Sequence, residues 1–233
     1  MPGGLFITGT DTAAGKTVVA RLIVRSLVAD GVRVAVMKPV AAGSIMTPDG
    51  PRNEDALGLI ADSNVDLPYA TINPYCLAAP VAPHLAARDT GVTIELSRIQ
   101  QHFKSLRAAA DCVIVEGAGG WLAPLNDGEF IADLAAALEL PVLLVVGLRL
   151  GCLNHALLTV AAIRQRRLLM AGWIANQIDP GFARMPDNLA TLERHIGMAP
   201  IAIVGHDPSG HWSASLPAGA VAALHSAMRK QLT

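Results

Sequence analysis

The chain has 233 residues, of which 52% are hydrophobic and 16% are charged, so it can bury one sizeable core, and we expect a single domain over residues 1–233. A formal net charge of −1 provides no basic field for a nucleic-acid backbone. Apolar runs such as residues 141–147 are far shorter than the ~20 residues of a membrane helix. The composition therefore argues against nucleic-acid and membrane partners.

Two further features concern the cellular compartment. No Lys or Arg precedes Lys16, so the chain lacks the basic segment that opens a secretory signal, and we expect a cytoplasmic protein. The cysteines, Cys76, Cys112 and Cys152, are scattered without paired spacing. We expect them to be buried or structural thiols that form no disulfide.

Apolar strand candidates alternate with longer helical stretches along the chain. The candidates are residues 5–8, 32–37, 111–115, 141–146, 172–175 and 200–204. This alternation predicts parallel strands with helical crossovers, and strands that are apolar on both faces indicate helices on both sides of the sheet. Residues 41–54 and 63–84 are rich in Pro, Gly, Asn and Asp and are predicted to be loops. Residues 208–217 are also predicted to be a loop, followed by a closing helix over residues 218–230.

A glycine-framed loop, Gly-Thr-Asp-Thr-Ala-Ala-Gly-Lys-Thr, connects the first predicted strand to a stretch that is apolar at helical spacing. This arrangement directs backbone N–H groups and the positive end of a helix dipole at one point, which favours a nucleotide phosphate. Lys16 is predicted to reach the terminal phosphates, and the Thr17 hydroxyl to bind the accompanying Mg²⁺. The alternative is a surface turn that contains Gly-Lys-Thr by chance, which the flanking strand and helix disfavour.

The second predicted strand ends at Lys38, and an acidic segment follows it. Lys38 is either a strand-end lysine that reaches water or a cation that stabilises a second anion beside the phosphates. Asp55 lies at the predicted start of a helix. The sequence supports two interpretations of Asp55 equally. It is either part of the site, or it is only a helix cap or an acidic residue of the first helical turn.

The third predicted strand leads to Glu116, where proteins with such loops commonly place the acid that holds Mg²⁺. The alternative is a solvated carboxylate. The glycine-rich residues 117–120 that follow would let backbone approach a ligand without obstruction by Cβ atoms.

The fourth and fifth predicted strands each end at a candidate binding group. Residues 151–154 open an amphipathic segment, so their free N–H groups would bind a carboxylate, or would form an ordinary helix start. Asn176 carries the donor and acceptor that complement the N6/N7 edge of adenine, or is a turn residue. Because the carboxyl ends of parallel strands meet at one edge of a sheet, we expect all these groups to form a single site.

The phosphate loop departs from the standard spacing. Thr10 occupies the position of the first glycine, and Gly9 lies one residue further back. With this added residue the loop resembles that of dethiobiotin synthetase. It does not resemble the loops of the partition and septum-site ATPases, which carry a second Lys where Asp11 and Thr12 stand here. The resemblance extends, in order, over residues 9–17, 38–40, 52–55, 115–121, 150–156 and 171–176.

The resemblance implies a P-loop NTPase-like α/β fold and a homodimer with substrate sites near the subunit interface. It implies an ATP-dependent cyclo-ligase that uses Mg²⁺ and CO₂ to close a ureido ring on 7,8-diaminopelargonic acid. Lys16 and Lys38 would be catalytic, and Thr17, Asp55 and Glu116 would serve Mg²⁺. The implied ATP-binding residues are Ala13, Ala14, Gly15, Lys16, Thr17, Val18, Asp55, Glu116, Gly117, Ala118, Gly119 and Asn176. The implied substrate-binding residues are Thr12, Lys38, Ala42, Gly151, Cys152 and Asn154.

Three positions differ from the family pattern. Ala42 stands where a hydroxyl residue is common, so one hydrogen bond to substrate is missing or is supplied by Ser44. Gln177 replaces a common Asp, and residues 202–207 lack the run expected around adenine. A ribose-binding carboxylate is therefore unassigned, the ATP assignment rests mainly on Asn176, and relaxed nucleotide selectivity is a hypothesis.

Two other classes are considered. A P-loop ATPase switch that binds a partner protein would keep Lys16, Thr17 and an acidic Mg²⁺ group but would not need Lys38 or residues 151–154. A related ATP-dependent ligase would keep the phosphate site and change the carboxylate pocket. No Ser-His-Asp or Cys-His arrangement is recognisable in the sequence, and closure of a ureido ring needs no protein nucleophile.

Overall fold

The computed structural model describes residues 3–207 and 215–229. Its central sheet has six parallel strands in the described part of the chain, in the order β10-β9-β8-β1-β7-β2. These strands are β1 (Gly3–Gly9), β2 (Val34–Met37), β7 (Cys112–Glu116), β8 (Val142–Gly147), β9 (Met170–Asn176) and β10 (Ala202–Val204). All six predicted strands are confirmed. Long apolar runs form them because both faces of the sheet are covered.

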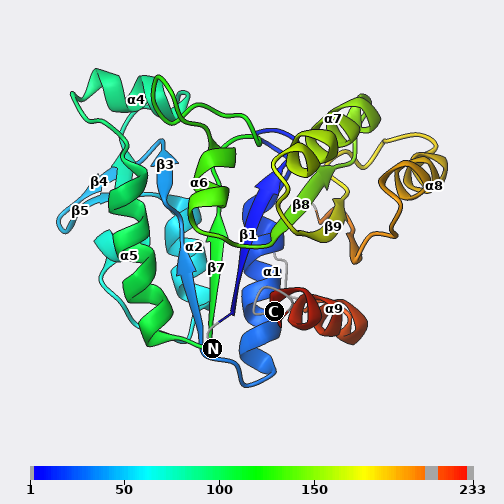
Figure 1. Cartoon of the computed structure of the whole chain (residues 1–233), viewed down its shortest axis with the longest axis horizontal. Coiled ribbons are helices and arrows are strands. Elements are labelled where there is room, and N and C mark those ends of the chain that lie inside the picture. The colour runs from blue at the N-terminus through cyan, green and yellow to red at the C-terminus, as the bar shows by residue number, and fades with distance from the viewer. Residues whose placement is uncertain (1–2, 208–214, 230–233) are drawn as a thin grey trace.

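Helices cover both faces of the sheet, as predicted (Figure 1). On one face α1 (Lys16–Ala29) packs against α2 (Glu54–Asp62) and α9 (Ala218–Arg229). On the other, α5 (Leu96–Ala109) packs against α6 (Ile131–Ala137), and α7 (Cys152–Gln165) packs against α8 (Met185–Ile196). The predicted closing helix is confirmed as α9, and most of the loop predicted before it lies outside the described residues.

The two predicted loops between β2 and α5 contain regular structure, which corrects the sequence prediction. Residues 41–54 hold most of β3 (Val40–Ala42), the β4 (Ile45–Thr47) and β5 (Gly50–Arg52) hairpin, and the first residue of α2. Residues 63–84 hold α3 (Tyr69–Ile72), β6 (Tyr75–Leu77) and the start of α4 (Pro83–Asp89). Three-residue strands show no periodicity, and β3 pairs with the distant β6, so local sequence carries little sign of them.

Among the described residues, no helix is both long and apolar enough to span a bilayer. Cys112 and Cys152 are buried free thiols, and Cys76 is a half-buried one. Burial raises the pKa of Cys112 to about 12, so this thiol stays protonated and inert.

Candidate active site

The phosphate loop connects β1 to α1, and its geometry depends on Gly15. Gly15 caps α1 with φ of 83°, and a Cβ at this position would lie 1.9 Å from the Asn176 side-chain nitrogen. Asn176 is buried, and its Nδ2 donates a hydrogen bond to the Ala14 carbonyl over 2.9 Å. The end of β9 therefore holds the loop from behind, which leaves the first N–H groups of α1 directed outward.

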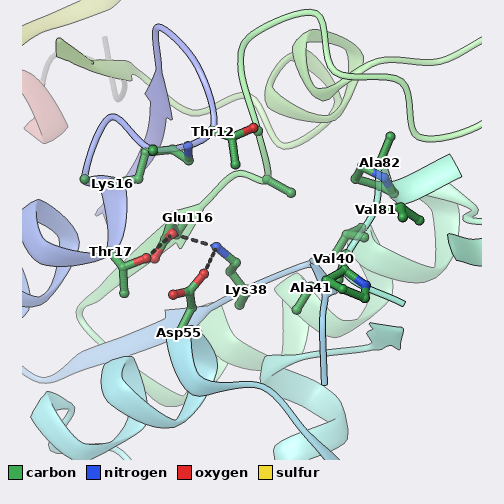
Figure 2. Close-up of a pocket in the computed structure, with 17 residues that line it drawn as sticks. Thr12, Lys16, Thr17, Lys38, Val40, Ala41, Asp55, Val81, Ala82 and Glu116 are labelled. Carbon is green, nitrogen blue, oxygen red and sulfur yellow. Dashed lines mark hydrogen bonds and ion pairs between the residues drawn. The ribbon is translucent and has the colours of Figure 1, made fainter. Parts of the chain in front are cut away.

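Lys38 lies at the centre of a buried charge cluster. Its side chain is 4% exposed, and its Nζ donates to Glu116 Oε1 over 2.6 Å and pairs with Asp55 Oδ2 at 2.9 Å (Figure 2). Thr17 Oγ1 donates to the same Glu116 oxygen over 2.8 Å. The carboxyl end of β2, the carboxyl end of β7 and the first turns of α1 and α2 thus meet at one point. The interpretation of Lys38 as a solvated lysine is wrong.

The environment shifts the pKa values of these groups in different directions. Burial, with the nearby Lys38 cation, lowers the pKa of Lys16 to about 8. Burial alone would also lower the pKa of Lys38, but the carboxylates of Glu116 and Asp55 outweigh it and raise that pKa above its ordinary value. The pKa of Asp55 is lowered, because the Lys38 cation outweighs the effect of burial. Lys38 therefore stays charged at neutral pH, whereas Lys16 is close to titration.

The side chains around Glu116 fit a Mg²⁺ ion. Glu116 is fully buried, and its Oε2 has no hydrogen-bond partner among the described residues. The Thr17 hydroxyl and the Asp55 carboxylate line the same cavity. An unsatisfied buried carboxylate oxygen beside a hydroxyl and a second carboxylate is the all-oxygen donor set that Mg²⁺ prefers.

A cavity of about 680 Å³ opens between the loop and β3. Charged side chains gather at one side of it, and Val40, Ala41, Val81 and Ala82 form an apolar wall opposite (Figure 2). The sequence did not indicate this wall. Residues 80–83 lie in a segment that was predicted to be a loop, and only the pairing of β3 with β6 brings them to the site.

The structure brings most of the predicted site residues to this cavity. Those that line it are Thr12, Ala13, Gly15, Lys16, Thr17, Lys38, Ala42, Asp55, Glu116, Ala118 and Gly119. The predicted residues outside its lining are Ala14, Val18, Gly117, Gly151, Cys152, Asn154 and Asn176. Ser44 does not line it either, so the structure does not support Ser44 as the replacement for the hydroxyl absent at Ala42.

Several alternatives left open by the sequence are decided by side-chain contacts. Asn53 is the cap of α2, since its Oδ1 accepts from the N–H groups of Asp55 and Ala56 at 3.1 and 3.3 Å. The Asp55 carboxylate is therefore free to face Lys38. Asn176 uses one N–H of its Nδ2 on Ala14, and its Oδ1 is buried and without a partner in the described structure. The contact to Ala14 therefore leaves the acceptor and the second amide N–H for a base.

Residues 151–154 form the start of α7, beside the loop but outside the cavity. Arg149 Nη2 donates to Asp11 Oδ2 within the loop, and His155 Nδ1 lies 3.7 Å from the same oxygen. Gly151 and Asn154 are exposed, and Leu150 is 92% exposed. A ligand carboxylate bound at this helix start would therefore lie outside the cavity.

The comparisons with known proteins identify the family. A model described as an AAA domain matches residues 3–212, which places the chain in that family. The ATP-dependent dethiobiotin synthetase BioD of Xanthomonas oryzae pv. oryzae (strain PXO99A) is 52% identical over 84% of this chain and 88% of its own length. The synthetase of the same name from Aromatoleum aromaticum is 51% identical over 88% of this chain and 91% of its own length. The chain belongs to the dethiobiotin synthetase family.

Solved structures support the fold of this synthetase. A ParA family ATPase from Chlorobium tepidum matches all of this chain and 95% of its own, with a TM-score of 0.56 and 16% identity. The cell division ATPase MinD from Pyrococcus furiosus matches 99% of both chains, with a TM-score of 0.55 and 15% identity. At such identities the likeness concerns the fold alone, and it confirms the predicted P-loop NTPase-like α/β class.

Replacing Glu116 with Gln is expected to raise the Mg²⁺ concentration needed for half-maximal activity by at least ~10-fold, the effect of disturbing even the outer shell of a metal site. Glutamine keeps one oxygen but loses the charge that faces the cavity. The measurement is the rate as a function of Mg²⁺ concentration, with Glu54→Gln as a matched control, because Glu54 is exposed and does not line the cavity. Unchanged turnover at limiting Mg²⁺ would remove Glu116 from the metal site.

The lowered pKa of Lys16 predicts a pH dependence of nucleotide binding. A phosphate group favours the ammonium form, which is fully present below the pKa of about 8 and is lost above it. Affinity for an ATP analogue is expected to fall as pH rises above about 8, by up to about tenfold per pH unit. Calorimetric titration across this range measures it. In Lys16→Arg, whose side chain stays charged, the slope should disappear. Equal slopes in both proteins would contradict the prediction.

Proposed function

We propose that this chain catalyses the ATP-dependent closure of a ureido ring on 7,8-diaminopelargonic acid with CO₂, giving dethiobiotin, ADP and phosphate, in the cavity between the phosphate loop and Lys38. The observation that carries the assignment to this cavity is the buried Lys38 ammonium, which faces the same space as Lys16 and two carboxylates. A nucleotide switch would have no need of a second buried cation there.

The reaction needs three steps, and every intermediate is anionic. One substrate amine takes up CO₂ as a carbamate, whose oxygen attacks the terminal phosphorus of ATP and releases ADP. The neighbouring amine then attacks the carbonyl carbon of the mixed anhydride and expels phosphate. We assign Lys16 to the phosphates, and Thr12 with Lys38 to the carbamate. Alignment of the reacting groups supplies up to ~7–11 kcal/mol, and fixed positive charge supplies much of the remainder.

Thr17, Asp55 and Glu116 are the residues that would hold Mg²⁺ in this scheme. The ion, when bound, offsets negative charge on the transferring phosphoryl group. The unsatisfied Glu116 Oε2 supports this assignment. The apolar wall that includes Val40 and Val81 would cover the alkyl chain of the substrate, with Ala42 beside it.

ATP is the assigned nucleotide. Ala13, Ala14, Gly15 and Val18 would contribute backbone N–H groups of the loop and first helical turn. Backbone of residues 117–119 would lie against the ligand, and Asn176 Oδ1 would accept from the adenine amino group. The hypothesis of relaxed nucleotide selectivity remains a prediction, and so do the cytoplasmic location, the single domain and the absence of nucleic-acid partners.

A homodimer would complete the substrate site. The start of α7 does not line the cavity of its own subunit, although residues 151–154 are assigned to the substrate carboxylate. Leu150 is 92% exposed and Leu158 on α7 is 62% exposed, so an apolar surface adjoins the proposed carboxylate site. We expect sedimentation to give a dimer mass, and Leu158→Asp to shift it toward the monomer and raise the KM for diaminopelargonic acid. A fully active monomer would contradict the assignment.

The direct test is mass spectrometry of the product formed from diaminopelargonic acid, bicarbonate, Mg²⁺ and ATP, with GTP and CTP in parallel. Dethiobiotin with ATP alone is the expected result for a selective enzyme, and dethiobiotin with several nucleotides would support relaxed selectivity. Nucleotide hydrolysis without dethiobiotin would overturn the proposal and favour the switch or another ligase.

A further inference from the structure

Lys38 is held through its backbone by a turn that belongs to neither the sheet nor the phosphate loop. It follows the last residue of β2, the edge strand of the described sheet, so only one strand adjoins it. Its N–H donates to the Ile72 carbonyl over 2.9 Å, and its carbonyl accepts from Asn73 Nδ2 over 2.6 Å. The turn that ends α3, formed by Ile72 and its cap Asn73, thus binds both backbone polar groups of Lys38.

The same turn is connected to the start of α2, which carries Asp55. Asn73 Oδ1 accepts from the Tyr69 hydroxyl over 3.0 Å, and that hydroxyl oxygen accepts from the Asn53 N–H over 2.8 Å. Asn53 in turn caps the helix at the Asp55 N–H. A continuous series of hydrogen bonds therefore runs from the Lys38 carbonyl, through Asn73, Tyr69 and Asn53, to the backbone of Asp55.

The two asparagines of this series are buried, and the half-buried Tyr69 is oriented by an arginine. Asn73 is 2% exposed and Asn53 is 7% exposed. The guanidinium of Arg52 lies over the Tyr69 ring, 4.2 Å from its centroid. Burial raises the pKa of Tyr69 above its ordinary value, so the phenol keeps the proton that it donates to Asn73. Buried networks whose groups are satisfied hold a single arrangement of the chain.

Rigid placement matters here because two carboxylates share the Lys38 ammonium. Glu116 approaches it from β7 in the sheet core, whereas Asp55 reaches it from α2 with a side chain that is 43% exposed. The position of α2 relative to Lys38 consequently determines whether Asp55 occupies a hydrogen-bond donor of the ammonium or leaves it for an anion in the cavity.

We propose that Asn73, Tyr69 and Asn53 form a positioning relay that fixes the separation of Lys38 and Asp55 in the reacting site, an inference that rests on the proposed function of this cavity. None of the three residues lines the cavity, so the relay acts through the two charged residues it holds. In the segment 52–55, Asn53 therefore has a positioning role in addition to the proposed role of Asp55 at the site.

The test compares two tyrosines that each lose one hydroxyl. Tyr69→Phe interrupts the relay and keeps the ring beneath Arg52. Tyr75→Phe is the matched control, because its hydroxyl accepts from the Glu95 N–H over 2.9 Å, its ring also lies under an arginine, Arg98, and this hydroxyl is not part of the relay. Asn73→Ala is the second interruption, at the Lys38 carbonyl itself. Thermal unfolding of all three variants measures the loss of stability.

We expect Tyr69→Phe and Asn73→Ala to lower kcat by about tenfold or more, with the KM for ATP changed by less than about twofold. Tyr75→Phe should lose comparable thermal stability and retain its kcat. The inference is overturned if kcat falls in proportion to stability in all three variants, or if Tyr69→Phe and Asn73→Ala both keep the full kcat.

A second measurement does not depend on catalysis. In a crystal structure of Tyr69→Phe, the separation of Lys38 Nζ and Asp55 Oδ2 is expected to differ from 2.9 Å, while that of Lys38 Nζ and Glu116 Oε1 is retained. An unchanged Asp55 separation would overturn the relay. If the wild-type protein forms no dethiobiotin, the proposed function fails, and this structural comparison still decides whether the relay exists.

Discussion

Lys38→Ala is expected to lower the rate of dethiobiotin formation by at least ~10²–10³-fold, the loss that follows removal of one group stabilising developing negative charge. In the proposed scheme the buried Lys38 cation serves the carbamate, whereas Lys16 and the loop N–H groups contact the phosphates. Affinity for an ATP analogue should therefore change by less than about tenfold. Product formation and calorimetric nucleotide binding, measured on the same preparation, check the two halves of this prediction.

Two variants control for the effect of Lys38 on folding. Lys38→Met keeps the length of the aliphatic stem and removes the ammonium group with its charge and N–H donors. Arg21→Ala breaks an ion pair of 2.6 Å with Asp62 that lies outside the cavity lining, and it should keep full activity. If Lys38→Ala and Lys38→Met lose nucleotide binding to the same extent as product formation, Lys38 has a structural role.

Gly15→Ala is expected to abolish nucleotide binding, with a loss of at least ~10²-fold in affinity. The added Cβ would have to lie 1.9 Å from Asn176 Nδ2. Asn176 is buried and holds the Ala14 carbonyl, so it cannot retreat without breaking that hydrogen bond. The loop would therefore move, and its N–H groups would no longer converge on the phosphates. Calorimetric titration with an ATP analogue measures the loss.

Gly197→Ala is the control that distinguishes the effect of the contact with Asn176 from the effect of backbone strain. Gly197 ends α8 with φ of 81°, close to the 83° of Gly15, but a Cβ there meets no atom within 4 Å. It should cost about 1 kcal/mol of stability, from the left-handed conformation alone, and leave nucleotide binding intact. Normal binding by Gly15→Ala, or an equal loss in both variants, would show that the contact with Asn176 does not shape the loop.

The phosphate loop and the six sheet strands could be predicted because their signals are local. A strand, a glycine-framed turn and a helix start follow one another within about 20 residues, and each buried strand is a single apolar run. The meeting of Lys38 and Glu116 at one sheet edge also followed, since the carboxyl ends of parallel strands must meet there. Asp55 lies on α2 and not at a strand end, so the sequence left its part in the site open.

The sequence by itself determined the sheet, the loop and the types of charged groups at the site, because these depend on neighbouring residues and on strand direction. Only the tertiary structure decided how those groups are used. Lys38 pairs with Glu116, which is 78 positions away in the sequence, and Asn176 donates a hydrogen bond to Ala14, which is 162 positions away. The apolar wall depends likewise on the pairing of β3 with β6. Such contacts are selected by packing of the whole chain, which no local pattern of residues encodes.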